Sequence, residues 1–182
     1  TSGDLRVSPS SSTSAYSIGH RHDAVRNVLY RAAKRAGMNP RLEVALTPDS
    51  GRRPADFATL EASGAVGYDV CVFESNMHVE GDRGASESPK TAAAAYSRDE
   101  KKISRVITED NIEMEMHPLC ANMYGGWSEE AEGFIRLVSR AEGMRSNGSG
   151  EELVGILRAR LSFSIMRSNA CSVGSSLEQG KR

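Results

Sequence analysis

The chain of 182 residues is long enough for one domain that buries about 70% of its unfolded surface. Its 23 basic and 24 acidic side chains leave a formal net charge of −1, which excludes a uniformly basic nucleic-acid binder. Hydrophobic residues make up 38% of the chain. Because no apolar run approaches the roughly 18 residues needed to cross a bilayer, we expect no membrane partner.

The N-terminal part is predicted to be a flexible leader followed by a helix. Residues 1–19 are rich in serine and poor in apolar side chains, a composition typical of flexible segments. Apolar residues then recur at helical spacing over residues 22–36, and Gly37 ends the pattern. His20 and His22 precede this helix. Because no cysteine or third histidine lies nearby, zinc binding is not favoured.

Three strands are predicted next. Residues 41–46 alternate between apolar and polar side chains and contain one acid, Glu43. Residues 56–60 and 68–73 are predicted to pair as antiparallel strands around a glycine-containing turn from Ala62 to Gly67. A hairpin therefore follows the first strand.

An aspartate lies on, or just before, each strand of this hairpin. If the carboxylates of Asp56 and Asp69 converge at one end of the pair, they can hold a hard divalent cation such as Mg²⁺ together with waters and phosphate oxygens. Spacing alone leaves a second interpretation open, in which both aspartates accept backbone hydrogen bonds at a turn and a strand end. Strand side chains alternate between faces, so Asp69 and Cys71 should share the face opposite to Val70.

A helix and a fourth strand are predicted after a polar loop. The helix starts near Pro89 and continues to Ile107, with an apolar stripe along one side. The strand covers residues 112–117, because isoleucine and methionine alternate there with glutamate, and it ends at Pro118. His117 at its end is either a general base or a merely hydrogen-bonded histidine.

Two further helices are predicted to complete the domain. Tyr124 to Trp127 form a turn that places Trp127 in the core, and Ser128 caps a helix that runs to about Glu142. After a loop, a last helix extends from Glu151 to about Ala170, and residues 173–182 are a flexible tail. The residues expected to face inward are Ala131, Phe134, Ile135, Val138, Ala141, Leu153, Ile156 or Leu157, Leu161 and Ile165.

Charge is distributed unevenly along the chain. Six basic residues and one acid lie between His20 and Arg41, whereas residues 109–132 contain seven acids and no lysine or arginine. This pattern predicts a positive surface on the first helix that can meet phosphates, with a negative surface elsewhere. A solvated helix face opposite an apolar stripe is the alternative.

Several short motifs occur in an order that resembles a known nuclease family. Arg53-Pro54-Ala55-Asp56, a gap of twelve residues and Asp69-Val70 are similar to the PD-(D/E)xK signature, in the version carried by the restriction-like endonuclease region of retroelements. Residues 20–172 carry the resemblance. The other motifs in matching order are Arg21-His22-Asp23-Ala24-Val25, Pro118-Leu119, Tyr124-Gly125-Gly126-Trp127, Arg160-Leu161-Ser162 and Arg167-Ser168-Asn169-Ala170.

The resemblance implies an α/β fold, a mixed central β-sheet flanked by helices with a restriction-endonuclease-like core. It implies divalent-metal-dependent hydrolysis of DNA phosphodiester bonds, with Mg²⁺ or Mn²⁺ held by Asp56 and Asp69. The main-chain carbonyl of Val70 would add a ligand, and Glu43 is a further candidate ligand. It also implies fusion to, or association with, a reverse transcriptase.

One position departs from the family pattern. The family would place a lysine at position 71, where this chain has Cys71. In the retroelement variety the resemblance implies that the following helix supplies this lysine, from Lys101 or Lys102. Helical geometry favours Lys102, which lies on the flank of the apolar stripe, although two solvated lysines would give the same pattern.

Two other functions remain open from the sequence. Loss of the lysine is compatible with a catalytically inactive nuclease-fold remnant that binds nucleic acid or has a structural role, and the acidic residues 109–132 are compatible with a protein-interaction module. Cys71, Cys120 and Cys171 have no CxxC spacing, which favours a reducing compartment, nuclear or cytoplasmic.

Overall fold

The computed structural model describes residues 12–44, 55–61, 64–73, 104–107 and 113–179. For residues 12–19, 43–44, 104–107 and 172–179 it describes the backbone alone. Within these ranges the elements are helix α1 (Ser12–Arg35), strands β1 (Arg41–Val44), β2 (Ala55–Glu61), β3 (Gly64–Phe73), β4 (Ser104–Ile107) and β5 (Glu113–Asn122), and helices α3 (Glu129–Ser146) and α4 (Gly150–Gln179). No helix in these ranges is long and apolar enough to span a membrane.

The described strands form one mixed sheet. Their order is β1-β2-β3-β5-β4, with β3 and β5 parallel and every other neighbouring pair antiparallel. The predicted hairpin is confirmed, because β2 pairs antiparallel with β3 from Phe57↔Tyr68 to Glu61↔Gly64. The predicted α/β class with a mixed sheet is therefore confirmed.

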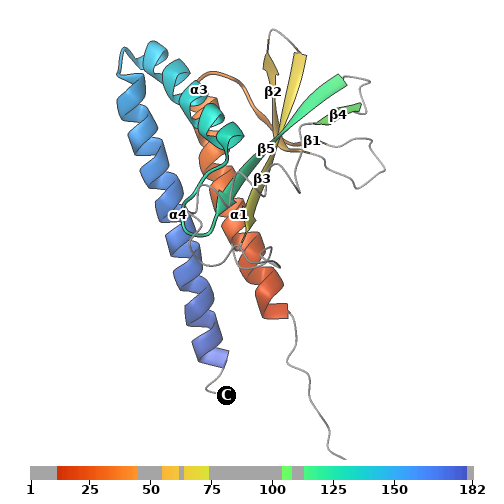
Figure 1. Cartoon of the computed structure of the whole chain (residues 1–182), viewed down its shortest axis with the longest axis vertical. Helices are drawn as coiled ribbons and strands as arrows, with labels where there is room; N and C mark the ends of the chain where they lie inside the picture. Colours follow the sequence, from red (N-terminus) through yellow and green to blue (C-terminus); the bar gives the residue numbers. More distant parts are fainter. Residues whose placement is uncertain (1–11, 45–54, 62–63, 74–103, 108–112, 180–182) are drawn as a thin grey trace, which may run out of the picture.

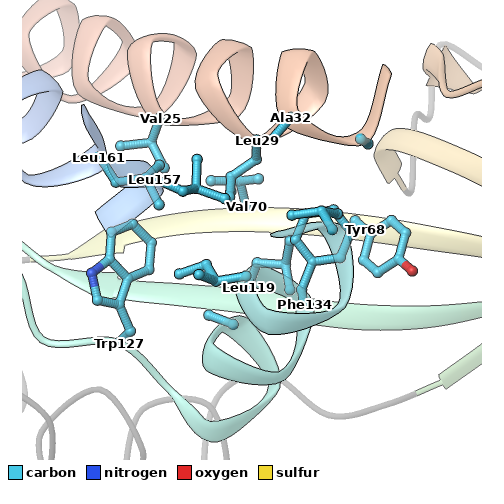
Figure 2. Close-up of a cluster of buried hydrophobic side chains, with 14 of the residues drawn as sticks. Val25, Leu29, Ala32, Tyr68, Val70, Leu119, Trp127, Phe134, Leu157 and Leu161 are labelled. Atoms are coloured by element: carbon cyan, nitrogen blue, oxygen red, sulfur yellow. The ribbon is translucent and has the colours of Figure 1, made fainter. Parts of the chain in front are cut away.

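Helices α1, α3 and α4 pack together beside the sheet (Figure 1). The main core lies where they meet β2, β3 and β5, and Figure 2 shows Leu29 of α1 and Leu161 of α4 above Val70 and Leu119 of the sheet. Trp127 is buried in this core, as predicted. Each helix supplies residues at helical spacing while the strands supply alternate residues, which is the packing expected for a layered α/β domain.

The opposite face of the sheet carries a second, smaller cluster. Ala55, Ala58, Met114 and Met116 are buried there. A Cβ atom at Gly67 would lie 2.5 Å from the sulfur of Met116, well inside van der Waals contact. Gly67 is therefore needed inside β3 for close packing, and the prediction that it belongs to the turn is wrong because β3 already begins at Gly64.

Residues 104–107, predicted as the end of a helix, form strand β4 instead. They pair antiparallel with β5 from Ser104↔Met116 to Ile107↔Glu113. A short apolar run with β-branched residues fits either periodicity, and here pairing with a neighbouring strand decides the outcome. The earlier part of the predicted helix, including Lys101 and Lys102, lies outside the described residues.

Strand β5 continues beyond Pro118, where the sequence predicted its end. It runs to Asn122 and pairs with β3 along its whole length, with Pro118 opposite Asp69. Proline lacks an N–H, but the described part of β4 covers only residues 113–116 of β5. Pro118 therefore lies where β5 has a single described neighbour, a position at which proline is tolerated.

The helices are longer than predicted. Helix α1 begins at Ser12 inside the segment expected to be a flexible leader, since extending an existing helix costs far less than starting one. The predicted cap is confirmed: the Ser128 hydroxyl accepts a hydrogen bond from Ala131 N. Helix α3 passes Gly143 and ends where Asn147 takes a left-handed conformation, and α4 reaches Gln179.

Candidate functional site

Three acidic residues predicted for the site occupy matching register positions on three neighbouring strands. The pairs Leu42↔Phe57 and Val44↔Ala55 leave Glu43 of β1 opposite Asp56 of β2. The last pair of the β2–β3 ladder, Phe57↔Tyr68, places Asp56 and Asp69 one step further along, at the end of that ladder.

The carboxylate of Asp56 closes the end of this ladder. Its Oδ2 accepts a hydrogen bond of 2.7 Å from the main-chain N–H of Val70, the residue after Asp69. Asp56 therefore lies one peptide unit from Asp69. Ala55 and Ala58 both pack in the second cluster although they are three residues apart, so side-chain alternation along β2 is broken next to Asp56.

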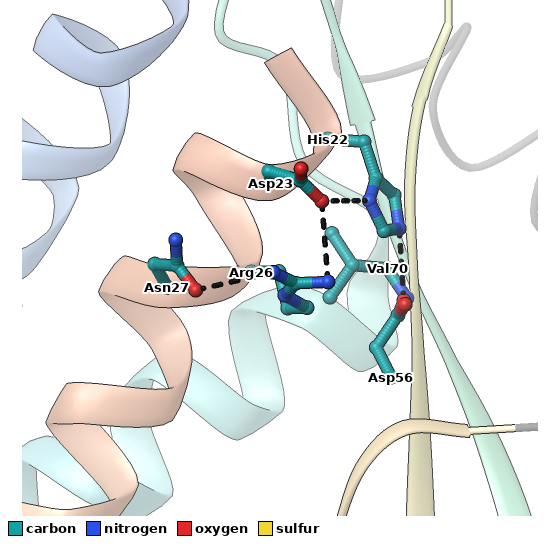
Figure 3. A network of polar contacts seen from close by, with 6 residues as sticks. All are labelled: His22, Asp23, Arg26, Asn27, Asp56 and Val70. Carbon is teal, nitrogen blue, oxygen red and sulfur yellow. Dashed lines mark hydrogen bonds and ion pairs between the residues drawn. The ribbon is translucent and has the colours of Figure 1, made fainter. Parts of the chain in front are cut away.

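His22 of α1 reaches the same carboxylate from the helix side (Figure 3). Its Nε2 lies 3.0 Å from Asp56 Oδ2, and its Nδ1 lies 3.3 Å from Asp23 Oδ1. Carboxylates only accept hydrogen bonds, so an imidazolium with two N–H groups satisfies both. The hydrogen bond to Asp56 raises the pKa of His22 above its ordinary value, although burial of the ring works in the opposite direction.

Arg26 adds polar contacts around His22 and Asp23. Arg26 Nη1 lies 3.1 Å from Asp23 Oδ1, and Arg26 Nη2 donates to Asn27 Oδ1 at 3.4 Å (Figure 3). Because both contacts of Asp56 fall on Oδ2, its Oδ1 has no partner in the described part of the chain.

Asp69 leaves the sheet on the face away from the helices. Its neighbours Tyr68 and Val70 both point into the main core, so the side chain between them alternates to the other face, as predicted. Asp69 is half-buried and so is Cys71, which follows on the same face. The Asp69 side chain therefore lies on the face opposite to α1, whereas the Asp56 carboxylate contacts His22 of α1. The two residues are connected through the main-chain N–H of Val70, which donates to Asp56.

Residues from the two ends of the chain also meet near this site. Arg21 of α1 is buried and its Nη1 donates to Asn169 Oδ1 of α4 at 3.1 Å. Asn169 Nδ2 in turn donates to the carbonyl of Met123 at 3.3 Å. Arg21, the residue before His22, is therefore bonded to a residue 148 positions away. Asn169 connects α1 and α4 at this point.

The six basic residues from Arg21 to Arg41 divide into two groups. Arg21, Arg26 and Arg35 have partners within the chain, and the last bonds Glu142 Oε1 at 2.7 Å. Arg31, Lys34 and Arg41 are exposed. The positive charge that this surface presents to phosphates is therefore smaller than the sequence suggests.

The side chain of His117 faces a separate cleft, although the residue pairs with Tyr68 of β3. Its Nε2 lies 2.8 Å from Glu115 Oε1, in a cleft of about 570 Å³ between the sheet and α3 that Glu61 and Glu130 also line. The cleft is at the start of β3, whereas Asp56 meets β3 at Val70 near its end. In the described part of the chain the sheet register places His117 one position before Pro118, the partner of Asp69, but the side-chain contact of His117 is with Glu115 and not with either aspartate.

Sequence reasoning missed the role of His22. It considered this histidine only as a metal ligand, whereas the structure pairs it with Asp56, 34 positions away. The available signal was a histidine flanked by Asp23 at the start of an arginine-rich helix, a composition that indicates a buried polar contact as readily as a metal site.

The described residues contain no group of three or more histidine, cysteine, aspartate or glutamate side chains that could hold a metal ion. Cys71, Cys120 and Cys171 do not form a disulfide. Comparison of the chain with models of protein families, with curated proteins and with solved structures finds no match.

Proposed function

We propose that this protein is a divalent-metal-dependent endonuclease that hydrolyses DNA phosphodiester bonds, with Asp56 and Asp69 at its centre. The observation that carries the proposal is the alignment of Glu43, Asp56 and Asp69 at one level of three neighbouring strands, with Asp56 bonded to the peptide that follows Asp69. Carboxylate oxygens are ligands that hard divalent cations prefer.

The donor set suits Mg²⁺ or Mn²⁺. Asp56 offers Oδ1, Asp69 offers its carboxylate and the Val70 carbonyl can add a neutral oxygen, while waters and substrate phosphate oxygens complete such sites. When bound, the metal would lower the pKa of a water molecule and stabilise charge on the phosphate oxygens. Glu43 is a further candidate ligand from β1.

The remaining residues have supporting roles on this proposal. His22 fixes the carboxylate of Asp56 from the side of α1, and its contact with Asp23 fixes the imidazole ring. Lys102 would orient or deprotonate the attacking water in place of the lysine that Cys71 replaces. Arg31 and Lys34, exposed on α1, would contact the DNA backbone.

The test is cleavage of supercoiled plasmid by the purified chain. We expect nicking that requires Mg²⁺ or Mn²⁺ and stops when the metal is chelated. Asp69→Ala should abolish it, and Lys102→Ala should lower the rate by about 10²-fold or more, whereas Lys101→Ala should leave it nearly unchanged. Nicking that survives Asp69→Ala, or that needs no metal, would refute the proposal.

A second candidate function is binding of nucleic acid without cleavage. It is favoured by Cys71 at the position where the nuclease pattern has lysine, and by the Asp56 carboxylate, whose Oδ2 already accepts two hydrogen bonds. On this proposal the chain binds plasmid DNA with an affinity that falls steeply as salt rises. No variant and no metal then produces nicks.

A further inference from the structure

Helix α4 carries two apolar stripes, and only one of them faces the core. Val154, Leu157, Leu161 and Ile165 are buried against the rest of the domain. A second set, which we call the outer stripe, consists of Ile156, Ala159, Phe163, Met166 and Ala170, and every member is exposed. Its large side chains are 42%, 62% and 60% exposed at Ile156, Phe163 and Met166.

The outer stripe lies on the side of α4 opposite to the core. At about 100° per residue its centre is about 180° from the centre of the buried set. A helix at the surface of a domain normally places polar residues there. Figure 1 shows α4 at the outside of the helical layer, away from the sheet. Since all five side chains of the outer stripe are exposed, the described part of the chain leaves the stripe uncovered.

The spacing of the outer stripe is that of a helix–helix contact. Successive members are three, four, three and four residues apart, which is the a/d pattern by which one helix packs lengthwise on another. Duplex DNA offers no apolar groove of this shape. The arginines that flank the stripe, Arg160 and Arg167, are too few for a backbone-binding surface.

We propose that a second copy of this chain covers the outer stripe, with the two α4 helices antiparallel. A two-fold axis on the outer side of α4, at the level of Leu161 along the helix, places Ala159 against Phe163 of the second copy and Ile156 against Met166 of the second copy. Large side chains then face small ones at the centre, as interdigitating packing requires. Two-fold symmetry repeats each of these contacts, which closes the assembly as a dimer.

Charge at the ends of the stripe agrees with the antiparallel direction. Glu152 precedes the stripe by one turn, and Arg167 lies near its other end. Antiparallel packing brings Glu152 near Arg167 of the second copy and aligns the helix dipoles favourably. Parallel packing would instead set Arg160 and Arg167 beside Gly155 and Ser162, which carry no charge. Charge complementarity therefore selects the antiparallel dimer.

Arg160 makes the opposite contribution in this alignment. It lies closest to the two-fold axis, so it faces its own equivalent in the second copy, and like charges in such positions weaken association. This predicts that removing the charge strengthens the dimer. A partner helix with acidic flanks, in contrast, would lose affinity on the same change.

The experiment is sedimentation velocity of the full chain over a range of concentrations up to about 100 μM, which populates a dimer of micromolar affinity. We expect concentration-dependent dimerisation. Phe163→Glu should raise the dissociation constant by about 30-fold or more. Met144→Glu, which replaces a 79% exposed methionine of α3 outside the stripe, should leave the constant unchanged. Arg160→Gln should lower it.

Cross-linking then tests the direction of the two helices. With the exposed Cys171 replaced by serine, the double variant Ile156→Cys, Met166→Cys should form a disulfide-linked dimer under oxidation, whereas Ile156→Cys alone should not. A chain that stays monomeric, equal effects of Phe163→Glu and Met144→Glu, a weaker dimer with Arg160→Gln, or cross-linking by the single variant would each overturn the proposal. None of these results depends on nuclease activity.

Discussion

The contact between His22 and Asp56 predicts a pH-dependent contribution to stability that a double-mutant cycle can isolate. The variants are His22→Ala, Asp56→Ala and the pair together, with unfolding by urea measured in buffer that contains a chelator. The cycle subtracts the separate loss of the Val70 N–H bond that Asp56 accepts, because that loss occurs in both variants that lack Asp56.

The magnitude follows from the geometry of the pair. A hydrogen bond between charged groups contributes about 1.5–3 kcal/mol. The side chains of His22 and Asp56 are 28% and 16% exposed, so partial screening by solvent places the coupling near about 1.5 kcal/mol when His22 is protonated. When the imidazole is neutral, a single neutral donor remains and the coupling should fall to about 0.5–1 kcal/mol.

The direction of the pH dependence follows from the raised pKa of His22. A histidine whose pKa is higher in the folded state than the ordinary 6.5 contributes stability that is fully present below the unfolded pKa. That stability is lost as pH rises through the folded pKa. The coupling should therefore be largest near about pH 5.5 and smallest near about pH 9.

A matched control is the pair Arg35–Glu142, whose Nε–Oε1 distance is 2.7 Å. Arginine and glutamate carry the same charges across this pH range, so the coupling of this exposed pair should stay at about 0–1 kcal/mol throughout. A coupling between His22 and Asp56 that is constant with pH, or that grows as pH rises, would refute the reasoning.

Two further predictions concern packing and capping. Gly67→Ala should lower the free energy of unfolding by about 1–3 kcal/mol, because the added Cβ would lie 2.5 Å from the sulfur of Met116. Gly155→Ala, where no atom lies within 4 Å of the added Cβ, should raise the free energy of unfolding by up to about 1 kcal/mol. Urea titration compares them, and equal effects would contradict this account. Ser128→Ala removes a buried acceptor for two main-chain N–H groups and should cost about 2 kcal/mol, whereas Ser149→Ala removes one exposed contact and should cost about 0.5 kcal/mol. Thermal unfolding checks this pair, and an equal loss of Tm in both would show that burial of the cap does not matter.

The parts of the fold that the sequence predicted well have local causes. Helix α3 follows from the Ser128 cap and from Phe134 and Val138 at helical spacing. The β2–β3 hairpin follows from alternating residues on either side of a glycine-containing turn. In each case residues close in sequence determine the structure, so local pattern is sufficient.

The parts that were predicted wrongly depend on distant partners. Residues 104–107 become a strand because β5 offers them a free edge, and β5 passes Pro118 because the proline has no described neighbour on one side. Neither of these pairing relations can be inferred from residues that are close together in the sequence. The same reason hides the bond from His22 to Asp56, which joins α1 to β2 across 34 positions.

The site itself was predicted in part. That Asp56 and Asp69 lie on neighbouring antiparallel strands is confirmed, since hairpin spacing alone determines it. The backbone hydrogen bond that Asp56 accepts from Val70 agrees with the second interpretation that spacing left open. The contact of Asp56 with His22 was not predicted, because it joins residues 34 positions apart.

Binding of Mn²⁺, followed by the loss of its free-ion electron paramagnetic resonance signal, tests most directly whether the two aspartates share a cation. The proposal predicts that the unaltered chain binds Mn²⁺ and that Asp56→Asn and Asp69→Asn each weaken binding by about tenfold or more. Binding that neither substitution weakens, or no binding at all by the unaltered chain, would contradict it.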